Sequence, residues 1–286
     1  MCWNFIKKTQ IIQAKYIYNK IGKCKLLMFD YKEALSFFKK AYGEAMILNE
    51  SNTIKNSLYN LALTYKRLEK YEDSLAYIDN FMNICDASQN IDEYISGTII
   101  KANCYIDKRD CNKTIQLYKS VLQSLNNIPE ILLGYIYNNM ALAYLELNKL
   151  EDSLAYFDKS IYIRETSDLE NLSHTLIDKS KIFIKNDLLS QACELIYKGL
   201  NLSIKYNDKE YIMKAYKLLE AIYIKTNDIE ELEKIYLNML DILREKSNKE
   251  DLLIIFSKLA LLSLDNNKHD MCRLYLNQII CEDFLK

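Results

Sequence analysis

Histidines and cysteines are the side chains of this sequence that could bind a metal or carry out catalysis. There are two histidines, His174 and His269, and eight cysteines, none of which forms a C-x-x-C pair or follows metal-ligand spacing. His174 lies four residues before Asp178, a spacing that on a helix indicates a surface pair rather than an acid–base dyad. We expect no metal and no cofactor, and we interpret the cysteines as small buried residues of a reducing compartment.

Motifs of the common enzyme classes are missing from the sequence. It has no glycine-rich phosphate loop, no serine-centred elbow and no cluster of His, Asp and Glu at catalytic spacing, so we expect no catalytic residues. The net charge of −1 favours neither nucleic acid nor an anionic membrane as a partner. No apolar run approaches membrane-spanning length, and Lys7 and Lys8 interrupt the N-terminal stretch. The sequence therefore predicts a cytoplasmic protein with no direct contact to nucleic acid or membrane.

Any binding site must be positioned by repeats, because the chain contains a near copy of itself. Glu-Asp-Ser-Leu-Ala-Tyr occupies residues 72–77 and again residues 151–156, two periods of about 40 residues apart. Within each copy, apolar residues recur at helical spacing on both sides of a three-residue turn. Only 5 glycines and 1 proline are present, which leaves little material for hairpins. The pattern indicates an all-helical chain of helix pairs.

The same register can be followed along the whole chain. The first helix of each pair carries a small residue at a recurring position: Gly22, Ala62, Ala102, Ala141, Ser180, Glu220 and Ala260. The second helix carries another twelve residues later: Ala34, Ser74, Thr114, Ser153, Ala192, Leu232 and Cys272. A large apolar residue follows four positions on: Phe38, Ile78, Tyr118, Phe157, Ile196, Tyr236 and Leu276. Small residues let two helices approach closely. The pattern therefore predicts close packing in the pairs that carry them, whereas the sixth pair departs from it with Glu220 and Leu232.

At these positions the chain resembles the tetratricopeptide repeat (TPR) family. The resemblance implies an all-α, right-handed solenoid of about seven helix-turn-helix repeats in a single domain over residues 1–286. The repeats are expected at residues 4–49, 52–86, 91–126, 129–165, 168–205, 208–246 and 249–284. Their period of about 40 exceeds the usual 34 and is similar to that of the sensor domains of Gram-positive peptide-responsive quorum-sensing regulators. Those regulators carry a helix-turn-helix domain before their repeats, and we expect this chain to have no DNA-binding domain of its own.

The TPR resemblance also implies a binding surface, because the first helices of such an array line a concave groove. An asparagine amide offers two donors and an acceptor, which match an extended peptide backbone, and lysines can meet a carboxylate. Asn60, Asn103 and Asn139 stand where the family places its backbone-gripping amides. The predicted peptide-binding residues are Asn19, Tyr59, Asn60, Lys66, Arg67, Asn103, Asn138, Asn139 and Lys181.

The resemblance suggests that the chain is a regulatory protein that senses a short peptide, with roles in quorum sensing and transcription regulation. Its partner would be a short peptide or an extended protein segment. One alternative is a constitutive protein–protein interaction scaffold without a small ligand, and another is a phosphatase-like or response-regulator-binding role. The last expected helix carries Met271, Leu274 and Ile280, which would be exposed at an open end of the array and predict a homodimer.

Overall fold

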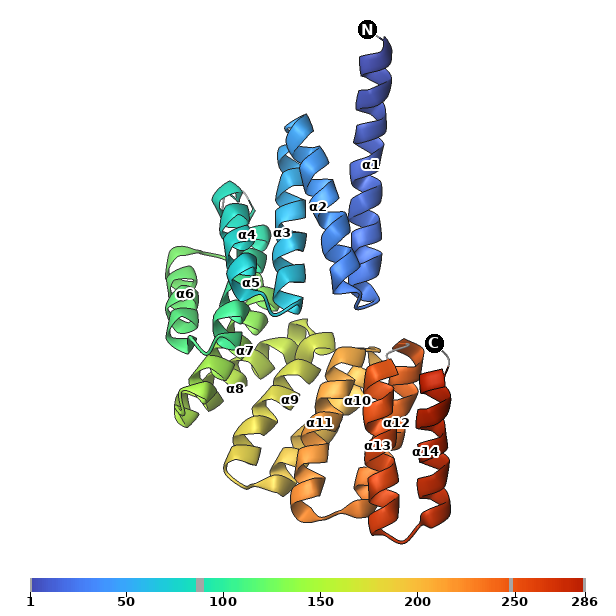
Figure 1. The fold of residues 1–286 in the computed structure, drawn as a ribbon. Helices are drawn as coiled ribbons and strands as arrows, with labels where there is room; N and C mark the ends of the chain where they lie inside the picture. The colour runs from blue at the N-terminus through green and yellow to red at the C-terminus, as the bar shows by residue number, and fades with distance from the viewer. Residues whose placement is uncertain (1, 86–89, 247–248, 285–286) are drawn as a thin grey trace. The chain divides into compact units, whose positions relative to one another are not determined.

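The chain folds into helices joined by short turns (Figure 1). The computed structural model describes the backbone of residues 2–85, 90–246 and 249–284, and the side chains of residues 14–85, 90–244 and 249–280. Within these ranges the helices are α1 (Cys2–Leu27), α2 (Tyr31–Leu48), α3 (Ser51–Arg67), α4 (Tyr71–Ile84), α5 (Ile91–Asp107), α6 (Cys111–Ser124), α7 (Glu130–Glu146), α8 (Leu150–Ser167), α9 (Leu169–Lys185), α10 (Leu189–Lys205), α11 (Lys209–Thr226), α12 (Ile229–Lys246), α13 (Lys249–Asp265) and α14 (His269–Phe284).

These fourteen helices of the described chain form seven consecutive pairs, so the predicted all-α repeat architecture is confirmed. The pairs follow the expected repeat ranges, except that α8 runs two residues beyond the expected end at residue 165. Residue 86, the expected end of the second repeat, lies outside the described residues. The chain forms two compact units, which we call unit 1 (Met1–Ile163) and unit 2 (Arg164–Lys286). The single continuous domain therefore stays a prediction.

The turn inside every pair is closed by one residue in the left-handed conformation. These residues have φ between 56 and 62°: Phe29, Glu69, Arg109, Asn148, Asp187, Asn227 and Asn267. The amide of the next residue bonds back to a carbonyl five positions earlier, as Lys70 does to Tyr65 at 3.0 Å and Lys149 to Tyr144 at 2.9 Å. This is the C-terminal motif that usually recruits glycine. The chain builds it with asparagine in three turns and with less suited side chains elsewhere.

The two small positions of a pair lie against each other, as the register predicts. The Ser74 hydroxyl donates to the Ala62 carbonyl at 2.7 Å, and Ser153 donates to Ala141 at 2.8 Å. In the first pair, a Cβ on Gly22 would come 2.6 Å from the ring of Phe38, so only glycine fits there. The hydroxyl-to-carbonyl bonds show that the twelve-residue spacing places both small residues at the crossing of the two helices.

The large positions fill the space between neighbouring pairs. Those of the first six pairs are buried, whereas Leu276 is 47% exposed, because α14 packs only against α13 within the described residues. In the sixth pair, Glu220 takes the place of a small residue without disrupting the packing. Its carboxylate accepts hydrogen bonds from the Tyr236 hydroxyl at 2.8 Å and from Lys258 at 2.6 Å.

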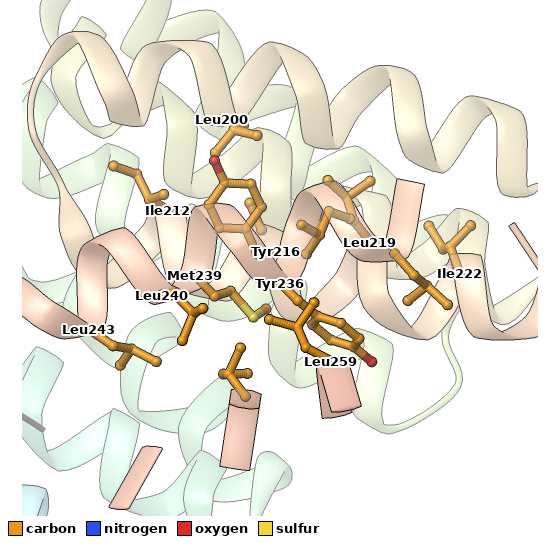
Figure 2. Close-up of a cluster of buried hydrophobic side chains, with 14 of the residues drawn as sticks. Leu200, Ile212, Tyr216, Leu219, Ile222, Tyr236, Met239, Leu240, Leu243 and Leu259 are labelled. Atoms are coloured by element: carbon orange, nitrogen blue, oxygen red, sulfur yellow. The ribbon is translucent and has the colours of Figure 1, made fainter. Parts of the chain in front are cut away.

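Each unit has its own hydrophobic core. Figure 2 shows part of the core of unit 2, where Leu200, Tyr216, Leu219, Met239 and Leu259 come together from α10, α11, α12 and α13. Unit 1 contains separate clusters between successive pairs. Contacts between neighbours only are typical of a stacked repeat. In the described part of the chain, every helix is too short or too polar to cross a bilayer.

The prediction that the cysteines are buried is wrong in part. Cys104 and Cys111 are buried, but Cys24 is exposed. Gly22 faces α2, and a residue two positions later lies about 200° further around the helix, on the opposite side. The side chains of Cys2 and Cys281 lie outside the described residues.

Candidate functional site

Two of the predicted asparagines join the first helices of unit 1 to each other. Asn60 on α3 is 6% exposed, and its Nδ2 donates to Oδ1 of Asn19 on α1 at 2.9 Å. Asn19 is only half-buried, and its own Nδ2 has no hydrogen-bond partner among the described residues. The buried amide thereby fixes the orientation of the more exposed one, which retains two donors.

A second asparagine pair joins α5 to α7. Asn139 is 8% exposed, and its Nδ2 donates at 2.9 Å both to Oδ1 of Asn103 and to the hydroxyl of Tyr118. Burial raises the pKa of Tyr118 above its ordinary value, so this hydroxyl stays neutral. Both Nδ2 hydrogens of Asn139 are used, whereas the half-buried Asn103 keeps its Nδ2 donors. We call Asn19, Asn60, Asn103 and Asn139 the amide pairs.

A groove of about 300 Å³ lies beside the first amide pair. Its lining comes from α1, α3, α4 and α5: Lys23, Asn56, Tyr59, Asn60, Phe81, Asp92, Glu93 and Ser96. The rings of Tyr59 and Phe81 form an aromatic wall, with centroids 5.4 Å apart. The volume is at the lower end of the range for ligand pockets, enough for one or two residues of an extended segment. The structure thus brings together the predicted residues Tyr59 and Asn60.

Other predicted residues of unit 1 are placed differently. Lys66 on α3 forms an ion pair with Asp107 on α5, with 3.1 Å between Nζ and Oδ2. Asn138 is buried next to Asn139 on α7, and Arg67 is exposed at the end of α3. None of these three lines the groove beside Tyr59. They remain predictions as binding residues.

In unit 2, the predicted residue Lys181 belongs to a charged cluster between α9 and α11. Oδ1 of the fully buried Asp178 accepts from Lys181 at 3.0 Å and from Lys214 at 2.7 Å. The hydroxyl of Tyr211 reaches Oδ2 of the same carboxylate at 3.4 Å. Burial alone would raise the pKa of Asp178, but the two ammonium groups hold it well below its ordinary value. We call Asp178, Lys181, Lys214 and Tyr211 the lysine–aspartate cluster.

His174 does not pair with Asp178, contrary to the helix-surface pair expected from their spacing. Its Nε2 lies 2.6 Å from Oδ2 of Asp208, the residue before α11, and its ring stacks on Tyr211 with centroids 3.5 Å apart. Asp208 also caps α11 by accepting from the backbone amides of Glu210 and Tyr211. The cap fixes Asp208 beside α9, and the two lysines of the cluster satisfy Asp178, which is why the local pair does not form.

Sequence reasoning missed Arg164, which is fully buried at the end of α8. Its guanidinium donates to the backbone carbonyl of Asn171 and to Oγ1 of Thr175, the latter at 3.0 Å. Asp168 lies near its Nε. These contacts hold Arg164 against the start of α9, within unit 2, and support the helix that carries Asp178.

One signal in the sequence could have indicated the two asparagine pairs and the contact between His174 and Asp208. Residues that meet across neighbouring first helices are about one repeat apart: 41 residues for Asn19 and Asn60, 36 for Asn103 and Asn139, and 34 for His174 and Asp208. Polar residues separated by roughly one period on first helices are therefore candidates for direct pairing. The spacing of four within one helix was the misleading signal.

Comparison with known proteins supports this architecture. Residues 133–167 match the model of the tetratricopeptide repeat family, which confirms the resemblance at that repeat. The chain is 15% identical to a Rap protein solved in complex with competence and sporulation factor, with a TM-score of 0.67 over 94% of this chain and 75% of that one. NprR in complex with its cognate peptide NprX is 20% identical, with a TM-score of 0.65 over 82% of this chain and 68% of that one. The resemblance to peptide-responsive regulators therefore extends to the fold.

A curated relative is also similar to this chain in sequence. Response regulator aspartate phosphatase A of Bacillus subtilis (strain 168) is 22% identical over 70% of this chain. The chain spans only 58% of that relative's length.

Proposed function

We propose that the chain is a regulatory protein that binds a short peptide or an extended protein segment on the first helices of its repeats. The observation that carries the proposal is the amide pair of Asn19 and Asn60 beside the groove walled by Tyr59 and Phe81. Oriented amides with donors to spare match the backbone of an extended chain, and an aromatic wall accommodates a side chain. The fold likeness to a Rap protein and to NprR, both solved with peptides, supports the same proposal.

Within the amide pairs, the buried and the half-buried asparagines have different roles. Asn139 is a positioning residue, because its Nδ2 hydrogens are bonded to Asn103 and Tyr118, whereas Asn60 uses one Nδ2 hydrogen to orient Asn19 and also lines the groove. Asn19 and Asn103 are the contact residues, because their Nδ2 groups have no partner among the described residues. This division differs from the sequence prediction, in which Asn60, Asn103 and Asn139 stand where the family places its backbone-gripping amides.

Native mass spectrometry of the chain purified from its source cells tests the proposal. A peptide receptor retains an adduct of peptide mass, and the adduct is lost from the Asn19→Ala, Asn103→Ala double variant while the protein stays folded. A constitutive scaffold, the alternative, gives the same spectrum for both proteins, and its partner binding declines gradually with substitutions spread over the surface.

The name of the curated relative favours a second candidate function, the binding of a response regulator. We propose that this chain acts by binding and not as an enzyme. Incubation with a phosphorylated receiver domain separates the two candidates. Accelerated loss of the phosphoryl group would establish a phosphatase and overturn the non-enzymatic proposal, whereas complex formation without hydrolysis would support a binding role.

We also propose that two copies associate through α13 and α14. Leu261, Leu264, Leu274 and Ile280 are exposed on these helices, and burying such apolar area favours association. Light scattering should give twice the protomer mass for the wild type and the protomer mass for Leu274→Glu. A wild-type protomer at high concentration would contradict the proposal.

A further inference from the structure

The lysine–aspartate cluster carries more positive charge than its own carboxylate requires. Lys181 and Lys214 both donate to Oδ1 of Asp178, at 3.0 and 2.7 Å. Their ammonium groups therefore lie within about 6 Å of each other, a separation at which like charges repel unless an anion lies between them. One lysine would neutralise Asp178, so the second leaves a net charge of +1 at a fixed place.

A further carboxylate, Glu210, lies near Tyr211, whereas Lys181 and Lys214 both form their ion pairs with Asp178. His174, which stacks on Tyr211, has its own carboxylate partner in Asp208. Lys217, one turn beyond Lys214 on α11, is exposed and makes no ion pair among the described residues. The positive charge of the cluster is therefore confined to the ammonium groups of Lys181 and Lys214.

The two ammonium groups remain reachable from solvent. Asp178 is fully buried, but the side chains of Lys181 and Lys214 are each 32% exposed. Lys214 uses a second donor on the Tyr211 hydroxyl at 3.2 Å, and its Nζ lies 4.3 Å from the centre of that ring. Each ammonium has three donors, so both keep at least one for a ligand. The buried carboxylate of Asp178 thus acts as a tether that fixes the positions of the two ammonium groups.

Two tethered ammonium groups with a surplus of one charge match a monoanion with two oxygens. A carboxylate meets this description, since each oxygen can accept from one lysine. A phosphate dianion would leave net negative charge against the stacked Tyr211 and His174 rings. The chemistry thus favours a carboxylate.

We propose that Lys181 and Lys214, tethered by Asp178, form a carboxylate-binding subsite that selects peptides with a free C-terminus or an acidic side chain. The inference rests on the proposed function, because the ligand is a peptide bound by first helices. It adds a chemical preference that the neutral amide pairs do not provide.

Affinity selection with the full chain tests this subsite. The probe is an equimolar library of random hexapeptides, prepared once with free carboxyl termini and once with C-terminal amides. The wild type should enrich free acids over amides if it reads the C-terminus, or Asp and Glu in both libraries if it reads a side chain. In Lys181→Gln and Lys214→Gln this preference should fall about 10- to 100-fold, the usual weight of a charge-assisted hydrogen bond.

Each of these variants keeps one lysine for Asp178, so the buried carboxylate stays paired and the fold is retained. Lys198→Gln is the matched control, since it removes an exposed lysine from α10 in the same unit. Peptides enriched by the wild type without any acidic or free-carboxyl preference, or with a preference unchanged in both cluster variants, would overturn the subsite alone. A wild type that enriches no peptide would overturn the proposed function and the subsite with it.

Discussion

The buried polar side chains that join the first helices of unit 1 are neutral amides, whereas the first helices of unit 2 are joined around a buried carboxylate. Asn60 and Asn139 need only hydrogen-bond partners, which they find in Asn19, Asn103 and Tyr118. Asp178 is paired with two lysines, which offset its desolvation. An amide surface can bind any peptide backbone, but a charged cluster discriminates between ligands and responds to pH. The two units thus offer different chemistry on the same structural element.

The largest effect that separates the two regions is expected from removing the buried charge. Asp178→Ala should lower the free energy of unfolding by about 3 kcal/mol, because two nearby ammonium groups lose their shared counter-ion. Urea denaturation measures this. Glu194→Ala is the control, since Glu194 pairs with Lys198 at an exposed site on α10 of the same unit, and the expected cost is below about 0.5 kcal/mol. Equal losses in the two variants would show that the cluster has no special role in stability.

A smaller loss is expected from removing a buried amide. Asn139→Ala should cost about 2 kcal/mol, because Oδ1 of Asn103 and the buried Tyr118 hydroxyl lose their donor. The exposed Asn112→Ala on the neighbouring α6 should cost less than about 0.5 kcal/mol in the same urea titration. If Asn139→Ala is as stable as Asn112→Ala, the amide pairs do not hold the first helices of unit 1 in position.

The dependence of stability on acidic pH should distinguish the two regions, because Asp178 titrates and the amide pairs do not. The pKa of Asp178 is depressed in the folded chain, so its contribution to stability is complete above the unfolded value of about 3.9 and is lost as pH falls below it. Denaturation between pH 6 and pH 3 should therefore show a shallower decline for Asp178→Asn than for the wild type. Asn139→Ala should keep the wild-type slope, since no charge is changed. Parallel curves for all three proteins would contradict this assignment.

The smallest effect is expected at the turns, because the same left-handed conformation closes the helix pairs of both units. Glu69 and Asn227 occupy the same left-handed position, in unit 1 and unit 2 respectively. Because asparagine tolerates this conformation better, Glu69→Asn should gain about 0.5 kcal/mol and Asn227→Glu should lose a similar amount. Thermal unfolding detects both shifts. A loss in Glu69→Asn would show that the turn position is set by the side chain and not by the backbone.

More of the fold than of the site could be predicted from the sequence, because the signals for the fold are local. The small and large positions act locally, so Ala62, Ser74 and Ile78 report the packing of one helix pair without knowledge of the rest. The partners of Asn60 and His174 depend on how neighbouring pairs align, which no single helix encodes. Arg164 was missed because an arginine near a helix end is ordinarily solvated, and only its contacts with Asn171 and Thr175 account for its burial.

The most direct test of peptide binding by oriented amides compares the two contact variants with the wild type, using one ligand. The affinity of the peptide pool enriched by the wild type should be measured by calorimetry for the wild type, Asn19→Ala and Asn103→Ala. We expect each variant to bind at least about tenfold more weakly and to remain folded, with a loss in the free energy of unfolding of at most about 2 kcal/mol because the buried Asn60 or Asn139 amide loses an acceptor. Unchanged affinity in both variants would contradict the assignment of these amides as peptide contacts.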